Sequence, residues 1–251
     1  MKEMESMVMA SMAMAAENIV VSETMSEESK EALYAKAVET YEHTNEKDKL
    51  INAQNTFKAL GNYKDSESYV GKCQDFIDYS KGETVTLGTY KGKDLRWKVL
   101  DQGGNNRMLL AEDVIECQVF NEVRDHTYWT GSSLRRWLNR EFMEEAFSLK
   151  ERMSIIITLR KADSNPRWSC ESGSDSKDKI FIFSHTELDE YLPSPADRAL
   201  GDDKWWWLRT SGSNALSMEV VEPDGEVYDI GINKNDPQIA VRPVFWIKLR
   251  R

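Results

Sequence analysis

Apolar residues recur every three or four positions through residues 24–82, the spacing that places side chains on one face of an α-helix. Three such stripes follow one another, and Gly61 and Gly82 end the second and third, since glycine readily terminates helices. Thr24 and Glu27 have capping-box spacing at the start of the first stripe. The pattern predicts a small all-α region of three amphipathic helices.

From residue 83 onward the pattern changes to short runs in which apolar and polar positions alternate, as in β-strands. Turn residues separate Thr84–Tyr90, Leu95–Asp101 and Arg107–Ala111, so these runs predict an antiparallel meander. We expect its middle strand to pair with the C-terminal strand.

Aromatic and β-branched runs near the end of the chain have the pattern of a β-hairpin. Met218–Glu222 and Glu226–Ile230 flank a Pro-Asp-Gly turn. Trp205–Gly212 precedes this hairpin and Val241–Ile247 follows it, and we interpret the whole stretch as the unit that the rest of the chain supports.

Two helices are predicted within the strand-rich part. Ser132 or Ser133 can cap the first, and Ser184 with Glu187 has capping-box spacing at the start of the second. Between them, residues 163–179 are rich in Ser, Gly and Asp, which predicts a polar loop.

Four motifs along the chain carry a family resemblance: Trp97–Leu100, Trp129–Asn139, Trp206–Arg209 and Val241–Val244. In this order they resemble a bacterial family of uncharacterised domains, related to the C-type-lectin fold shared by formylglycine-generating enzymes and the variable proteins of diversity-generating retroelements. The resemblance covers about residues 83–251. It implies an α+β class: a C-type-lectin-like mixed antiparallel sheet with two helices, preceded by the small all-α region.

The segment Phe57–Ser66 resembles the turn between helices of tetratricopeptide-like repeats. The resemblance implies that residues 24–82 are a helical hairpin region. Since one such unit cannot bury its own apolar face, we expect it to pack on the following domain, on a partner or on a second copy, which makes a homo-oligomer possible.

Residues 1–23 are rich in Met and Ala, but Glu3 and Glu5 precede the apolar run, the wrong charge for a secretion signal. We interpret them as a flexible segment. This interpretation predicts a cytoplasmic protein, with a surface or secreted location as the alternative.

Composition excludes several classes of function. The net charge of −10 argues against nucleic-acid partners, and the absence of a long apolar run argues against a membrane span. Cys73, Cys117 and Cys170 have neither disulfide-framework nor zinc-site spacing. The sequence therefore predicts no metal and no cofactor.

The sequence also lacks the signatures of catalysis. The formylglycine-generating relatives that the resemblance suggests use a cysteine pair near the C-terminus, whereas no cysteine follows Cys170. No hydrolase, metalloprotease or P-loop motif occurs, which predicts a non-enzymatic protein. A divergent enzyme using Asp125, His126 and Arg135 near Trp129 is the alternative.

The tripeptide Glu222-Pro223-Asp224 resembles the calcium- and sugar-binding motif of C-type lectins. The second motif of those lectins is missing, and Asn235-Asp236 is the nearest substitute. Because Pro-Asp-Gly is also an ordinary turn sequence, we favour a simple hairpin turn over a calcium site.

The prediction that remains is a binding surface. Trp205, Trp207 and Arg209 share one face of a strand, and an exposed Trp beside an Arg can stack on sugars or on protein side chains. Bracing of the fold is the alternative role for Trp207 and Arg209. The predicted ligand-binding residues are Trp205, Trp207, Arg209, Asn214, Glu219, Glu222, Asp224, Tyr228 and Asn233.

The sequence thus predicts a non-catalytic protein that binds a protein or carbohydrate ligand on its C-terminal sheet and hairpin. Three alternatives stay open. They are a receptor diversified by a retroelement, a divergent enzyme and a structural subunit of an oligomer.

Overall fold

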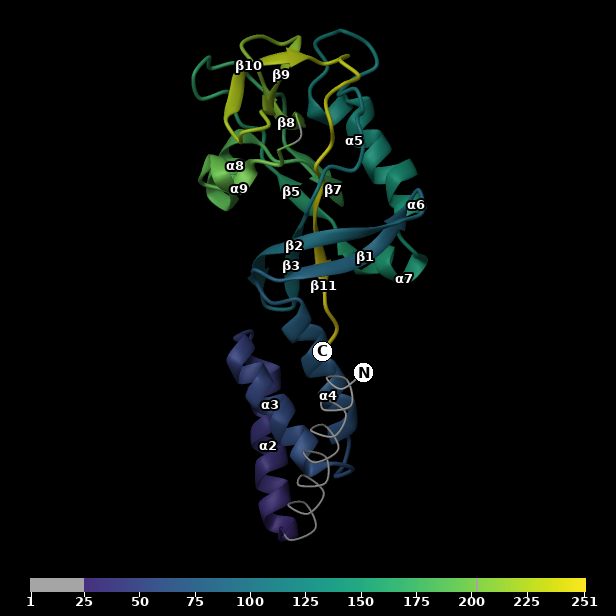
Figure 1. Cartoon of the computed structure of the whole chain (residues 1–251), viewed down its shortest axis with the longest axis vertical. Coiled ribbons are helices and arrows are strands. Elements are labelled where there is room, and N and C mark those ends of the chain that lie inside the picture. Colours follow the sequence, from purple (N-terminus) through teal and green to yellow (C-terminus); the bar gives the residue numbers. More distant parts are fainter. Residues whose placement is uncertain (1–24, 202) are drawn as a thin grey trace, which may run out of the picture. The chain divides into compact units, whose positions relative to one another are not determined.

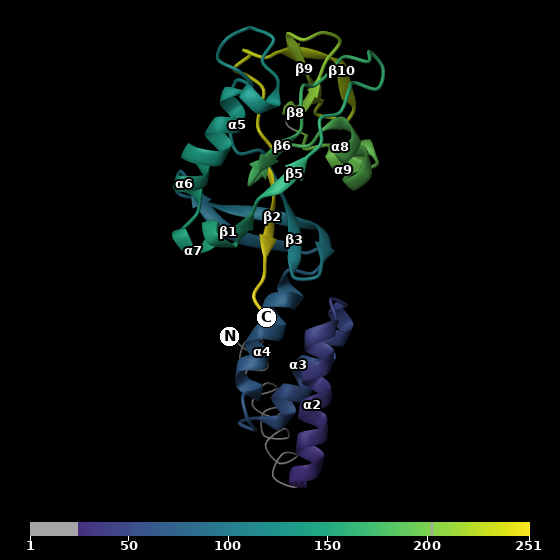
Figure 2. The same ribbon diagram turned by 180° about the vertical axis from the view of Figure 1, so that it is seen from behind.

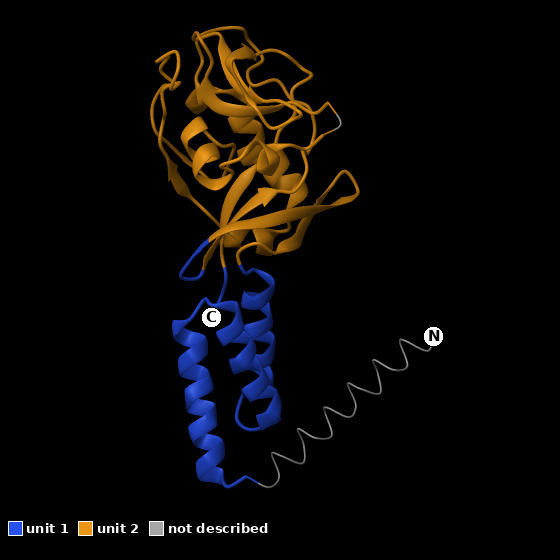
Figure 3. Cartoon of the chain, turned by 60° about the vertical axis from the view of Figure 1, so that its left-hand side comes forward, with its two compact units in different colours: residues 1–80, 102–105, 249–251 blue, residues 81–101, 106–248 orange. Residues whose placement is uncertain are grey.

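The computed structural model describes residues 25–201 and 203–251 and divides the chain into two compact units, which Figure 3 colours separately. Unit 1 takes the described residues up to 80, with 102–105 and 249–251, and unit 2 takes 81–101 and 106–248. Within the described residues no helix is long and apolar enough to cross a membrane. The Met/Ala-rich segment predicted to be flexible lies outside the described residues.

Unit 1 contains the three predicted helices, shown in Figure 1 as α2 (Glu27–His43), α3 (Lys47–Leu60) and α4 (Ser66–Asp78). The first begins differently from the prediction, because Ser26 is its N-cap and accepts a hydrogen bond from the Ser29 amide. Gly61 ends α3 with a φ of 59°, as the glycine signal predicted.

The core of unit 1 is a cluster of aromatic rings from all three helices. Tyr41, Phe57 and Phe76 are fully buried, and Tyr69 stacks on Phe57 at 4.7 Å between centroids. Arg251 joins this cluster, since its guanidinium lies 5.2 Å from the Tyr41 ring and 4.7 Å from the Phe76 ring. It also donates to the Tyr41 carbonyl. A residue 210 positions further along the chain than Tyr41 therefore takes part in the core of these helices.

Unit 2 is a mixed α+β unit with a curled antiparallel sheet (Figures 1 and 2). The strands run in the order β1-β2-β3-β11-β4, and β7 also pairs with β11. Their bounds are Thr84–Tyr90 for β1, Lys93–Gly103 for β2, Asn106–Ala111 for β3, Ile155–Ile156 for β4, Ile180–Phe181 for β7 and Val244–Lys248 for β11.

The meander is confirmed, but the expected partner of the C-terminal strand is wrong. β11 pairs antiparallel with β3, with Val244 opposite Leu110 and Lys248 opposite Asn106. The middle strand, β2, has both edges occupied by β1 and β3, so it has no free backbone groups for a third neighbour.

A separate three-stranded sheet contains the predicted hairpin. Its order is β10-β9-β8, from Trp206–Ser211 (β8), Ser217–Val221 (β9) and Val227–Asn233 (β10). The Pro-Asp-Gly sequence forms the turn between β9 and β10, and the Glu222 amide donates to the Glu226 carbonyl at 2.8 Å.

The helices of unit 2 lie between β3 and β8 in the sequence. The first predicted helix starts at Ser132, whose hydroxyl caps it, and runs as α5 (Ser133–Trp137), a π-helical turn η2 (Leu138–Phe142) and α6 (Met143–Ala146). The second is α8 (His185–Tyr191), and its Ser184/Glu187 capping box is present as predicted. The remaining elements are η1 (Trp129–Gly131), α7 (Leu149–Ser154), β5 (Thr158–Arg160), β6 (Ser176–Asp178) and α9 (Pro195–Arg198).

We expect Gly225→Ala to lower the free energy of unfolding by about 2 kcal/mol. Gly225 has a φ of 91°, and a Cβ atom there would lie 1.9 Å from the backbone oxygen of Pro195. Gly92→Ala is the matched control, because Gly92 also has a positive φ but the methyl group added there would have nothing within 4 Å. Urea unfolding of both variants measures the difference, and equal losses would show that the contact with Pro195 contributes nothing.

Candidate functional site

The nine residues predicted to bind a ligand divide into a buried and a surface group. Trp207, Arg209 and Glu219 are buried. The surface group is partly or fully exposed and comprises Trp205, Asn214, Glu222, Asp224, Tyr228 and Asn233.

Trp207 belongs to the core and does not present its ring to a ligand. Its indole nitrogen donates to the Gln118 carbonyl at 2.8 Å, and its ring packs against Phe120. Two further segments cover the outer edge of β8. The backbone amide of Trp207 donates to the Ala240 carbonyl, and the backbone amide of Arg209 donates to the Phe183 carbonyl.

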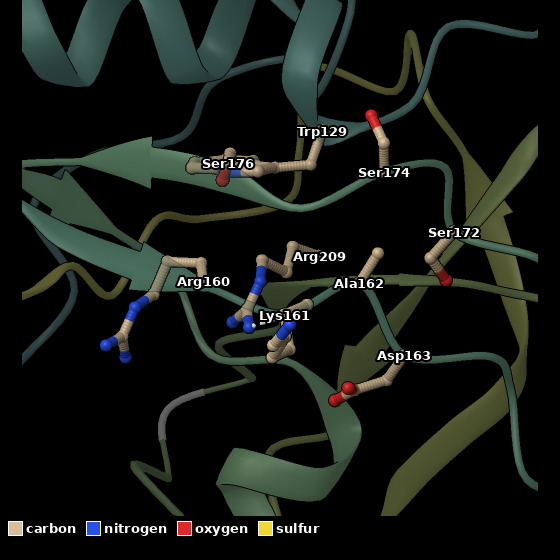
Figure 4. Close-up of a pocket in the computed structure, with 9 residues that line it drawn as sticks. All are labelled: Trp129, Arg160, Lys161, Ala162, Asp163, Ser172, Ser174, Ser176 and Arg209. Carbon is tan, nitrogen blue, oxygen red and sulfur yellow. Dashed lines mark hydrogen bonds between the residues drawn. The ribbon is translucent and has the colours of Figure 1, made fainter.

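Arg209 also lies inside unit 2, beside the pocket shown in Figure 4. Its guanidinium donates to the Ile182 carbonyl at 2.9 Å, to the Lys161 carbonyl at 3.0 Å and to Glu187. The pocket has a volume of about 10 Å³, which is room for a single water molecule. These contacts fit the alternative role of Arg209, in which it braces the fold.

Glu219 is fully buried and paired with His185, whose Nδ1 lies 2.8 Å from the Glu219 carboxylate. This hydrogen bond raises the pKa of His185 above its usual value. Burial raises the pKa of Glu219 as well, because the charged carboxylate loses its hydration. The pair therefore forms part of the polar interior of unit 2.

Asn165, which the sequence patterns did not single out, fixes the polar loop 163–175 to the three-stranded sheet. Its amide nitrogen donates to the Ser211 carbonyl at 3.0 Å, to the Glu219 carboxylate at 2.7 Å and to the Asp229 carbonyl at 2.9 Å. Its amide oxygen accepts from the backbone amides of Arg167 and Trp168, both at 2.9 Å.

The loop presents Trp168 at the surface in a fixed position. The ring nitrogen of Trp168 donates to the Asp229 carboxylate at 3.3 Å, and the Arg167 guanidinium lies 5.0 Å from the Trp168 ring centroid. Arg167 also forms an ion pair with Asp229 at 3.2 Å. We call Arg167, Trp168 and Asp229 the Trp168 cluster, and Trp168 remains 43% exposed within it.

An aromatic pair also lies at β10. Trp205 and Tyr228 meet edge to face with 6.0 Å between their centroids, and both are half-buried. Tyr228 and Asp229 are adjacent in the strand, so this pair and the Trp168 cluster are attached to neighbouring residues of β10. β10 thus carries two aromatic contacts at neighbouring positions, and the predicted site residues include Trp205 and Tyr228 but not Trp168.

Two exposed polar residues of the predicted surface, Asn214 and Asp224, serve the turns in which they lie. Asn214 accepts from the Leu216 amide at 2.9 Å, and Asp224 accepts from the Glu226 amide at 3.0 Å. Burial, and after it repulsion from Asp224 and Glu226, raises the pKa of Glu222. Over residues 25–201 and 203–251, no group of three or more His, Cys, Asp or Glu side chains is arranged to hold a metal ion.

Residues 104–249 match a family described as a domain of unknown function, DUF6273. The chain belongs to the DUF6273 family. No curated protein and no solved structure matches it.

All nine predicted residues and the Trp168 cluster lie within the DUF6273 region, whereas the motif Trp97–Leu100 precedes it. The DUF6273 region also contains the residues of the alternative enzyme site. Asp125 accepts from the Thr127 amide and from Asn121, while Arg135 donates to Asp178, so Asp125 and Arg135 belong to separate hydrogen-bond networks.

Proposed function

We propose that the chain is a non-catalytic recognition protein whose DUF6273 region binds a protein or carbohydrate ligand on the sheet β10-β9-β8. The Trp168 cluster is the observation that carries this proposal. An indole that is 43% exposed is held by a hydrogen bond and by a guanidinium, although it is not packed in the core. A side chain fixed before binding loses little entropy on binding, and Trp and Arg are the residues that dominate binding energy at interfaces.

The residues around β10 supply further contacts in this proposal. Ile230, which follows Asp229 in β10, is 43% exposed and adds apolar surface along the strand. The Trp205–Tyr228 pair offers a second aromatic surface at the neighbouring position of β10. Polar groups at the end of β10 and in the flanking turns orient the ligand, namely Asn214, Glu222, Asp224 and Asn233.

We further propose that unit 2 has a C-type-lectin-like arrangement. Two features support it: the C-terminal strand β11 joins the sheet of the first strands, and a separate three-stranded sheet carries the candidate surface. In a retroelement-diversified relative, exposed residues such as Asn214 and Asn233 could vary without disturbing the core.

A cytoplasmic location is part of the proposal. Cys73, Cys117 and Cys170 are all free thiols, and free thiols persist in reducing compartments.

Binding to an array of defined glycans and to a displayed peptide library tests the proposal. We expect Trp168→Ala to weaken binding of the selected ligand by about tenfold or more, because it removes the fixed ring. Tyr228→Ala tests whether the ligand also contacts the Trp205–Tyr228 pair.

Leu149→Ala and Ile157→Ala are the matched controls, because they remove apolar side chains that are 67% and 64% exposed elsewhere in unit 2. Circular dichroism establishes that each variant folds. Equal binding by the wild type and by a Trp168→Ala, Tyr228→Ala double variant would contradict the proposal.

A further inference from the structure

A hollow of about 320 Å³ lies in unit 2 beside α5 and the π-helical turn η2. Four cationic side chains and one carboxylate line it: Arg135, Arg136, Arg140, Lys177 and Asp178. They give the hollow a net charge of +3 in a chain whose net charge is −10. The hollow is therefore a concentrated cationic site on an acidic protein.

The one carboxylate in the hollow is already neutralised. Asp178 is 2% exposed and lies 2.5 Å from the Nε atom of Arg135. It also accepts hydrogen bonds from the Trp129 indole at 2.9 Å and from the Ser176 hydroxyl at 2.5 Å. Its oxygens are thus occupied, and it cannot balance the charge of the other three cations.

Arg135 fixes the geometry of the hollow in addition to binding Asp178. Its guanidinium donates to the Thr130 carbonyl at 3.0 Å and to the Lys177 carbonyl at 3.2 Å. These bonds tie the start of α5 to β6, so the backbones that carry the remaining cations are held in place. Asn139 adds a second tie, because its side chain donates to the Ile180 carbonyl at 2.8 Å.

Among the described residues, Arg136, Arg140 and Lys177 have no acidic partner. All three are exposed, and none forms an ion pair with a carboxylate in the part of the chain that the structure describes. Arg136 and Arg140 are four positions apart along a helical segment, where like charges repel. A multiply charged anion in the hollow would relieve this repulsion and accept their N–H groups.

We infer that this hollow binds the phosphoryl group of a small phosphorylated compound. Two guanidinium groups and an ammonium match the charge and the several acceptor oxygens of a phosphomonoester better than those of a single carboxylate. Thr130, whose side chain carries a hydroxyl group, also lines the hollow. The volume lies at the lower end of the range for small-molecule pockets, which fits a compound the size of a sugar phosphate.

Isothermal titration calorimetry of the full chain with glucose 6-phosphate, glucose and inorganic phosphate tests this inference. We expect glucose 6-phosphate and inorganic phosphate to bind with affinities that fall as salt is added, and glucose not to bind. A phosphoserine peptide is a further probe. Tighter binding of this peptide than of glucose 6-phosphate would identify a protein as the source of the phosphoryl group, and the reverse order would identify a small molecule.

The decisive comparison is between two triple variants with the same loss of charge. Arg136→Gln, Arg140→Gln, Lys177→Gln should weaken phosphate binding by about tenfold or more. Arg124→Gln, Lys150→Gln, Lys248→Gln neutralises three exposed cations outside the hollow and should keep binding within about twofold. Equal losses in the two variants, or no binding of any phosphorylated probe to the wild type, would overturn the inference.

Discussion

We expect Asn165→Asp to lower the free energy of unfolding by about 4 kcal/mol at neutral pH. The substitution hardly changes the shape of the side chain, but a carboxylate cannot donate a hydrogen bond. It leaves the carbonyls of Ser211 and Asp229 without the donor that they have in the wild type. It also places a second negative charge beside Glu219, which is fully buried.

Urea unfolding measures this loss, and Asn214→Asp is the matched control. Asn214 is exposed and its side-chain oxygen caps a turn, so the same chemical change there should cost less than about 0.5 kcal/mol. Acidification should restore part of the stability of Asn165→Asp, because a protonated aspartate regains a donor. A loss no larger than that of the control would show that Asn165 does not fix the loop.

The second large effect concerns the buried pair of His185 and Glu219. We expect His185→Ala to lower the free energy of unfolding by about 3 kcal/mol near pH 6, because it leaves the buried Glu219 carboxylate without its charged partner. His126→Ala is the control, since His126 is exposed. Urea unfolding at one pH compares the two variants.

The same pair makes stability depend on pH. The pKa of His185 is raised in the folded chain, so its protonated form stabilises the fold fully below about pH 6.5, and this contribution disappears as the pH rises through the raised value. The pKa of Glu219 is also raised, and the cost of its buried charge likewise grows as the pH rises. The free energy of unfolding should therefore fall from pH 6 towards pH 9, by about 1.4 kcal/mol for each unit by which the His185 pKa is raised.

His185→Gln isolates the contribution of the histidine, because glutamine can still donate to Glu219 but does not titrate. Its unfolding free energy should fall less steeply over the same pH range than that of the wild type. If the unfolding free energies of the two proteins fell equally steeply with pH, His185 would not be the source of the pH dependence.

Local signals account for the parts of the fold that could be predicted. Helical spacing and Gly61 define α3, and a Pro-Asp-Gly turn between β-branched runs defines the hairpin of β9 and β10. These features depend on neighbours in the sequence. The pairing of β11 with β3 depends instead on which strand edge is free, and alternation of apolar residues carries no information about that.

The candidate site could be predicted only in part, for the same reason. Alternation places Trp205 and Trp207 on one face, but Trp207 is buried because Gln118 and Phe120 cover it, and these are distant in the sequence. Asn165 looks like an ordinary loop residue, yet its amide reaches a carbonyl 64 positions away. A single Trp in a loop of polar residues was the one available signal for Trp168.

Lys234 shows the same limit for a charged residue. Its sequence neighbours suggest an exposed turn, but it is fully buried and donates to the carbonyls of Thr127 and Ala215. Burial lowers the pKa of Lys234 to about 8. No sequence pattern marks which lysine will satisfy carbonyls from two distant loops.

The contact between Arg251 and the aromatic core of the first helices has a consequence during protein synthesis. Arg251 follows Tyr41, whose carbonyl it binds, by 210 positions. At the usual rates of translation a ribosome needs roughly 10–40 s to make that stretch of chain. The three helices are thus made before Arg251, and their core lacks one cation until the codon for Arg251 has been read.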